Sequence, residues 1–249
     1  MTSGKATLPD TIAALRVIVA SQEPGAALPA EAALASEIGS TRTLVNTAIG
    51  HLMAEGQLIR QGKKAIVQPI KTIHRRVPTR YTAAYREAHG ARGAFDAEIR
   101  EHGMQPRWTT EPGQVPAPEP IAELFGIEPG TEVATRARDM YANDVPVQVA
   151  VTYMPVDVAT STGLTDVDSG PGGMISRLAE TDNAQKSVTE TIQVRVPTAR
   201  EQEVLRLPAD ARVYELTHAA HTAQGRCVEA TVHVMPVHLW DLSYTWNLT

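Results

Sequence analysis

Two arginines that alternate with alanine have the chemistry of an anion site. Arg136 and Arg138 stand two residues apart in a β-favouring run, so we expect both side chains on one face of a strand. Two cations on a sheet face made mostly of Val, Ala and Met are unfavourable unless an anion or an acid faces them. Two interpretations stay open: the pair binds an anionic ligand, or it forms surface ion pairs with Glu132 or Asp139.

A second group of polar residues has the chemistry of DNA contact. The guanidinium of Arg42 can reach a phosphate or a guanine edge from the start of a helix, and the hydroxyls of Thr41 and Thr43 can reach phosphates. The alternatives are a solvated arginine and a threonine that only caps the helix. Lys63 and Lys64 occupy a turn, where they contact a phosphate or the minor groove, or are simply solvated.

Residues of the usual catalytic and metal sites are present without the spacing that such sites need. His218 and His221 are three apart on an expected strand, so they point to opposite faces, and Cys227 is the only cysteine. Neither a P-loop nor a G-x-S-x-G motif occurs. We therefore expect no catalytic residue, no metal site and no cofactor, and we expect Cys227 to pack in the interior.

The DNA-contact residues fall within a pattern of three short helices and a hairpin. Apolar residues recur at helical spacing after Asp10-Thr11, over about 30–38, and again after Ser40-Thr41. Residues 58–67 then predict a two-stranded hairpin with a basic tip at Lys63 and Lys64. This order is typical of a winged helix-turn-helix, in which the third helix enters the major groove. We assign residues 1–68 to it.

The charge distribution supports this division. The chain of 249 residues has a net charge of −5, but residues 1–80 contain ten Lys and Arg against five Asp and Glu, a balance of +5. The remainder carries −10. A small basic domain joined to a larger acidic one is expected when only one of the two binds nucleic acid.

The rest of the chain mixes short strands with helices. We interpret residues 69–93 as a linker and 94–249 as an α+β domain with an antiparallel sheet. Expected strands are 108–115, 133–141, 145–154, 187–196, 213–221 and 227–235. Expected helices are 94–102, 118–125, 174–180 and 198–205, and 156–173 is expected to be a long polar loop.

The first domain resembles the GntR family of DNA-binding domains. The resemblance lies in Leu28-Pro29-Ala30-Glu31, Thr41-Arg42-Thr43-Leu44-Val45, Glu55-Gly56 and Gly62, at near-constant spacing over about residues 10–68. It implies binding to a palindromic operator as a homodimer. The DNA-binding residues that it implies are Glu31, Thr41, Arg42, Thr43, Asn46, Thr47, Lys63 and Lys64.

The second domain resembles, more loosely, the UTRA effector domain of the HutC-like subfamily, which has the chorismate lyase fold. The resemblance rests on Leu124-Phe125-Gly126-Ile127, Arg136-Ala137-Arg138, Tyr153-Met154-Pro155 and Val228-Glu229. It implies a pocket for a small-molecule effector. The residues expected to line it are Arg136, Arg138, Tyr153, Gly172, Gly173, Glu229 and His233. Independently of the resemblance, Gly170-Pro171-Gly172-Gly173 precedes a short expected helix, so this segment either exposes backbone N–H groups to an anion or is a plain flexible loop.

Several positions depart from the family pattern. Ala32 and Asn46 replace two arginines of the DNA-binding domain, and Lys64 replaces a wing glycine. Asn46 can pair with adenine where arginine prefers guanine, so we expect a different operator. Ala94, Gly173 and Ala150 replace polar groups that suit sugar phosphates. We therefore expect an anionic effector less polar than a sugar phosphate, such as an acidic or lactone-like metabolite.

These observations predict a cytoplasmic, homodimeric, ligand-responsive repressor that is not an enzyme. The lone cysteine and the absence of an apolar leader or membrane segment fit the cytoplasm. Two alternatives stay open. One is a repressor without a ligand response, and the other is a small-molecule-binding or lyase-like domain whose winged helix serves only assembly.

Overall fold

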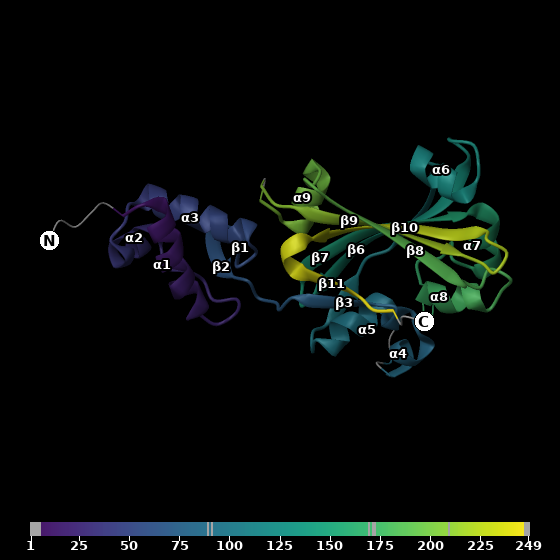
Figure 1. The fold of residues 1–249 in the computed structure, drawn as a ribbon, viewed down its shortest axis with the longest axis horizontal. Helices are drawn as coiled ribbons and strands as arrows, with labels where there is room; N and C mark the ends of the chain where they lie inside the picture. The colour runs from purple at the N-terminus through teal and green to yellow at the C-terminus, as the bar shows by residue number, and fades with distance from the viewer. Residues whose placement is uncertain are drawn as a thin grey trace.

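The computed structural model describes residues 6–88, 90, 92–168, 170, 173–208 and 210–246. A small N-terminal unit and a larger C-terminal unit lie end to end and are joined by the segment between β2 and β3 (Figure 1). None of the helices in these ranges has both the length and the apolar character needed to cross a membrane.

The N-terminal unit is the predicted winged helix-turn-helix. Its elements are α1 (Leu8–Ala20), α2 (Glu31–Ile38), α3 (Arg42–Ala54), β1 (Leu58–Gln61) and β2 (Lys64–Val67). Helix α1 begins earlier than expected, because Thr7 rather than Asp10 or Thr11 is its N-cap, with Asp10 completing a capping box. The turn between α2 and α3 is tight because Gly39 adopts a left-handed conformation, φ +71°.

A shared apolar core holds these helices together. Leu15 of α1, Leu34 of α2, and Val45 and Leu52 of α3 are fully buried and pack with Leu58 of β1. The 3–4 spacing seen in the sequence thus forms one face on each helix. The opposite face of α3 is left exposed to solvent.

The C-terminal unit is built on an antiparallel sheet, as predicted. Among the described residues the sheet has seven strands in the order β4-β6-β7-β10-β9-β8, with β5 also pairing with β6. The strands are β4 (Pro106–Trp108), β5 (Glu111–Pro116), β6 (Glu132–Ala142), β7 (Val145–Pro155), β8 (Ser187–Arg195), β9 (Val213–His221) and β10 (Cys227–Pro236). The turn between β6 and β7 is made by Asn143 and Asp144, both at positive φ.

Helices cover the two faces of this sheet unequally. On one face stand α6 (Glu119–Phe125) and α9 (Ala199–Leu205) (Figure 1). The other face carries α4 (Ala83–Ala88), α5 (Ala94–Glu101), α8 (Gly173–Ala179), and a parallel ribbon of β3 (Ile73–Val77) and β11 (Trp240–Tyr244). The remaining elements are α7 (Val156–Thr162) and two single 3₁₀ turns, η1 (Thr79–Tyr81) and η2 (Val237–Leu239).

Three expectations about the elements need correction. Residues 69–93 are not a plain linker, since they contain β3, η1 and α4, with Ile73 and Arg75 fully buried. The strand expected at 108–115 is split into β4 and β5, which pair with successive stretches of β6. The polar segment 156–173 begins with helix α7, which buries Val158 and Ala159 against the sheet.

Candidate functional site

The exposed face of α3 gathers the expected DNA-contact residues. Arg42, Thr43, Asn46 and Thr47 are all exposed, and their spacing places them on one side of the helix. Thr41 instead accepts a hydrogen bond from the backbone N–H of Leu44 through its hydroxyl, so it serves as the helix cap.

Glu31 of α2 orders two of these side chains. Its carboxylate accepts from Arg42 Nε at 3.1 Å and from Asn46 Nδ2 at 2.8 Å. These hydrogen bonds, from Asn46 first and Arg42 second, lower the pKa of Glu31. The Arg42 side chain remains 75% exposed. Glu31 therefore orients Arg42 and Asn46 while leaving the guanidinium accessible.

The wing presents its two lysines at the tip. Lys63 lies in the turn of the hairpin and Lys64 begins β2, and both are exposed. The structure contains no DNA, so a contact of these lysines with phosphate or the minor groove stays a prediction.

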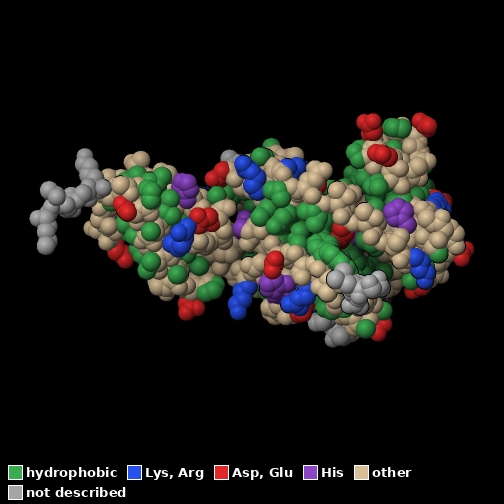
Figure 2. Space-filling model, viewed as in Figure 1, with side chains coloured by type: hydrophobic (Ala, Val, Ile, Leu, Met, Phe, Trp, Pro, Cys, Tyr) green, Lys and Arg blue, Asp and Glu red, His purple; other side chains and the backbone are tan. Residues whose placement is uncertain are grey.

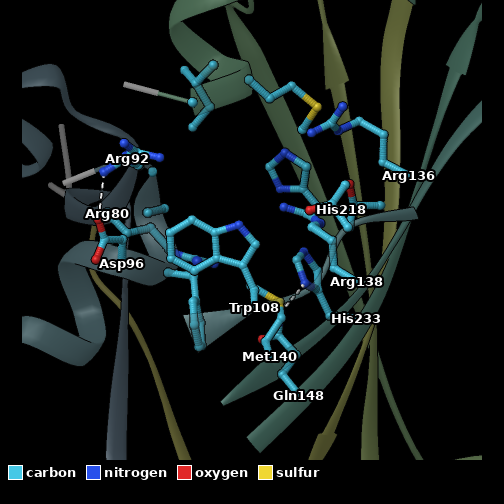
Figure 3. A pocket seen from close by; sticks show the side chains of 18 of the residues that line it. Arg80, Arg92, Asp96, Trp108, Arg136, Arg138, Met140, Gln148, His218 and His233 are labelled. Atoms are coloured by element: carbon cyan, nitrogen blue, oxygen red, sulfur yellow. Dashed lines mark hydrogen bonds between the residues drawn. The ribbon is translucent and has the colours of Figure 1, made fainter. Parts of the chain in front are cut away.

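The second candidate site is a cavity between the sheet and the layer formed by η1, α5 and α8. Its volume is about 110 Å³, several times what one water molecule requires. Trp108 projects into it, facing the strands that carry Arg138, His218 and His233 (Figure 3). The polar residues lining it are Arg80, Tyr81, Arg92, Asp96, Thr110, Arg136, Arg138, Gln148, His218, Glu229, Thr231 and His233. The apolar ones include Phe95, Trp108, Met140, Met174 and Ile175.

Sheet register explains why so many polar side chains meet here. Arg136 lies opposite Thr152, Thr152 opposite Thr231, Thr231 opposite His218, and His218 opposite Glu190. Directly paired residues point to the same face, so five strands place one polar row under the cavity. Each strand by itself has only one or two polar residues at these positions, and only the pairing aligns them.

Arg138 has an incomplete set of hydrogen-bond partners in the cavity. Its Nη2 donates to Thr152 Oγ1 at 2.8 Å, while its buried Nε has no hydrogen-bond partner among the described residues. Burial lowers the pKa of Arg138 to about 10, and the cations Arg136 and Arg80 also lower it, against the opposing effect of Glu229. A half-buried guanidinium with an unpaired Nε favours an anion.

Arg136 has a different role from the one expected. Its guanidinium donates to three backbone carbonyls, those of Leu164 at 2.9 Å, Asp166, and Val167 at 3.0 Å. The two arginines do share a face, but neither pairs with Glu132 or Asp139 in the described part of the chain. Arg136 therefore fastens the segment after α7 at the cavity edge, and Arg138 is left for a ligand.

His233 and Glu229 also line the cavity. His233 Nδ1 lies 3.1 Å from Gln148 Nε2, and burial, together with Arg80, His218 and Arg138, lowers the pKa of His233 well below its usual value. The imidazole is therefore neutral near pH 7. Glu229 accepts from Thr231 at 2.6 Å and from Gln185 at 2.5 Å.

Three other expected effector residues have different outcomes. Tyr153 does not reach the cavity: it lies one residue past Thr152, on the opposite sheet face, and packs near α6. Gly173 does line the cavity, at the start of α8. Gly172 lies outside the described residues.

Part of the cavity wall was missed because residues 69–93 were interpreted as a linker. Arg80 of η1 is buried and pairs with Glu98 of α5, with Nε and Oε1 at 2.8 Å. Burial raises the pKa of Glu98 despite Arg80. The sequence indicates this part of the wall only through Arg75 and Arg80, two arginines that lie near apolar residues. Their burial cannot be inferred until their acidic partners, Glu190 and Glu98, are known.

Both resemblances found in the sequence are matched by family models. The model "UTRA domain" matches residues 102–238, and "Bacterial regulatory proteins, gntR family" matches residues 15–67. The uncharacterized HTH-type transcriptional regulator SCO4628 of Streptomyces coelicolor is 27% identical over 90% of this chain and 86% of its own length. The uncharacterized HTH-type transcriptional regulator YurK of Bacillus subtilis is 30% identical over 54% of this chain, and the match spans 51% of YurK.

Comparison with solved structures finds similar folds. The crystal structure of PhnF from Mycobacterium smegmatis superposes with a TM-score of 0.59 at 18% identity, covering 96% of this chain and all of the other. A separate structure of the effector domain of PhnF covers 61% of this chain with a TM-score of 0.52 at 16% identity. At such identity the likeness concerns the fold alone.

Proposed function

Because the chain belongs to the UTRA-domain transcriptional regulators of the gntR family, we propose that it is a homodimeric repressor released from a palindromic operator by an anionic effector. It acts in the cytoplasm, on DNA, and has no catalytic role. The observation that carries the effector proposal is Arg138, a half-buried guanidinium that lines the cavity and whose buried Nε has no hydrogen-bond partner among the described residues.

The exposed face of α3 supports operator binding. Arg42 and Asn46 are held by Glu31, so less side-chain entropy is lost when they meet the groove. Asn46 makes a bidentate contact with adenine, and Arg42 contacts guanine or a phosphate. Thr43, Thr47, Lys63 and Lys64 bind the DNA backbone on either side.

An exposed apolar strand supports self-association. A palindromic operator offers two half-sites related by a two-fold axis, which a homodimer matches. Hydrophobic side chains gather across the middle of the C-terminal unit (Figure 2). The edge strand β8 exposes Val188, Ile192 and Val194 at 37%, 38% and 58%. A second copy of the chain that packs on β8 would bury its exposed apolar side chains and would cover the unpaired backbone groups of this edge strand.

The cavity supports an effector that is anionic but less polar than a sugar phosphate. The Arg138 guanidinium lines the cavity, and the cations Arg80 and Arg136 add positive potential. Trp108 and Phe95 add apolar surface to the lining, and Met140 lies beside Arg138 on β6. A small carboxylate with an apolar body would pair with the arginines and pack against the apolar side chains of this lining.

Operator binding is tested with DNA from the chain's own upstream region. Affinity is measured by fluorescence anisotropy at several salt concentrations, and it should fall steeply with salt because Lys and Arg displace counterions. Arg42→Ala should abolish binding, whereas Arg200→Ala, an exposed arginine of α9, should leave it unchanged. Equal loss in the two variants, or binding insensitive to salt, contradicts the proposal.

Effector binding is tested by a thermal-shift screen of small organic anions. A compound that binds the folded protein raises the melting temperature by mass action. The shift should disappear in Arg138→Met, and the compound should lower operator affinity in the wild type. A shift that persists in Arg138→Met places the ligand elsewhere, and the absence of any shift favours a repressor without a ligand response.

A further inference from the structure

A series of polar contacts leads from the cavity to strand β3, with one wider gap of 3.9 Å between Glu229 and His218. It contains Arg138, Thr152, Thr231, Glu229, His218, Glu190 and Arg75, which we call the buried polar chain. We propose that this chain couples occupancy of the cavity to the position of β3, and through β3 to the winged helix. The proposal rests on the proposed function, because it assigns the route by which an effector acts on DNA binding.

The cavity half of the chain is a one-way series of donors. Arg138 donates to Thr152 at 2.8 Å, and Thr152 and Thr231 are joined at 2.7 Å. The Thr231 hydroxyl donates to Glu229 at 2.6 Å, so it must accept from Thr152. Hydrogen bonds in such a series polarise one another, so loss of the Arg138 bond weakens the bonds that follow it.

The second half joins two carboxylates through an imidazole. His218 lies between them, with Nε2 3.9 Å from Glu229 and Nδ1 3.3 Å from Glu190. Glu190 in turn contacts Arg75 of β3, and the hydroxyl of Tyr81 bridges Arg75 at 2.8 Å and His218 at 3.0 Å. The chain therefore crosses five strands of the sheet, from β6 to β8, before it reaches β3.

The position of β3 depends heavily on this last contact. The Arg75 side chain is fully buried, and its Nε and Nη1 have no hydrogen-bond partner among the described residues. Glu190 and the Tyr81 hydroxyl therefore stabilise this buried charge together, and loss of the Glu190 contact is costly. The ribbon of β3 and β11 shares no backbone pairing with the main sheet in the described part of the chain, so side chains hold it in place.

An anion bound by Arg138 changes the first link. The Arg138 guanidinium turns toward the ligand, Thr152 loses its donor, and the hydroxyls and carboxylates that follow reorganise. Strand β3 begins at Ile73, six residues after β2 of the wing ends at Val67. A shift of β3 therefore moves the wing. By linkage, DNA that favours one position of β3 also changes the affinity of the cavity for its anion.

The test uses the full chain without ligand or DNA. Thr152→Val removes the hydroxyl link with little change in volume, and exchange of the β3 amides is followed by hydrogen–deuterium mass spectrometry. We expect exchange in residues 73–77 to accelerate about fivefold or more. The same substitution should have little effect in a Glu190→Gln background, where the chain is already broken. Thr135→Val, a buried threonine whose strand position faces the opposite side of the sheet, is the control.

Equal acceleration in both backgrounds, or equal acceleration by Thr135→Val, overturns the proposal. Should Glu190→Gln fail to fold, His218→Gln interrupts the same chain while leaving Glu190 on Arg75, and the same outcomes apply. Operator affinity is measured in parallel. If the wild type binds no DNA, the proposed function fails, yet the exchange experiment still decides whether the cavity and β3 are coupled.

Discussion

His238 of the C-terminal unit packs directly against Gly56, at the C-terminal end of α3. A Cβ atom placed on Gly56 would lie 2.2 Å from the Cβ of His238, so only glycine allows this approach. Leu58 and Gln68 from the winged helix, and Pro146 and Leu207 from the C-terminal unit, line a cavity of about 300 Å³ at the same junction. The two units therefore meet at the helix that carries the DNA-contact face.

Gly56→Ala is expected to separate the two units. Gly56 and Gly39 both have positive φ, +75° and +71°, so alanine at either costs roughly 1–2 kcal/mol of backbone strain. Only at Gly56 does the new methyl group also collide with His238, because at Gly39 no described residue beyond its chain neighbours comes within 4 Å of the added Cβ. Small-angle scattering should show a larger radius of gyration for Gly56→Ala than for Gly39→Ala. Identical scattering from the two variants contradicts a docking role for this contact.

Acid is expected to weaken the same junction. Burial lowers the pKa of His238 from 6.5 to about 4, so the docked imidazole is neutral while the released one binds a proton below pH 6.5. Docking stability is therefore fully present above pH 6.5 and is lost as pH falls toward 4, by up to about 3 kcal/mol. Scattering between pH 7 and pH 4.5 should show the units separating. His238→Gln should remove this pH dependence, and a transition that persists in that variant assigns it to another group.

Periodicity and capping predicted most elements, because they are local properties of the sequence. Strands 213–221 and 227–235 and the helix at 198–205 were placed within a residue or two of β9, β10 and α9. The segment 69–93 failed for a physical reason. Arg75 and Arg80 are polar in the sequence, yet they are buried against Glu190 and Glu98, and partners so distant in sequence cannot be seen in a local pattern.

The cavity residues were predicted only in part, because strand alternation is visible in the sequence and distant hydrogen-bond partners are not. The alternation of Arg136 and Arg138 correctly placed both on one face, but their distinct roles depend on Thr152 and on the carbonyls near Leu164. Tyr153 was assigned by resemblance, although its position next to Thr152 sets it on the other face by strand alternation alone.

Asn46→Arg is expected to change operator preference without abolishing binding. Asparagine pairs with adenine and arginine with guanine in the major groove, a difference of about 1–3 kcal/mol per base pair. Arginine at this position still faces Glu31, which now holds Asn46 at 2.8 Å. Selection from randomised duplexes should recover adenine for the wild type and guanine for the variant at one position of each half-site. Unchanged selection would place Asn46 away from the bases.

The two arginines of β6 are expected to respond oppositely to replacement by methionine. Arg138 is half-buried, and its buried Nε has no partner among the described residues, so Arg138→Met removes an incompletely paired cation and should stabilise the protein by about 1–2 kcal/mol. Arg136 satisfies the carbonyls of Leu164, Asp166 and Val167, so Arg136→Met should destabilise it by about 2–4 kcal/mol. Urea unfolding measures both changes at once. Suppose that Arg138→Met is more stable than the wild type and no longer responds to any anion. Arg138 would then serve ligand binding and lower the stability of the protein. Destabilisation by both variants to the same extent would instead assign Arg138 a structural role.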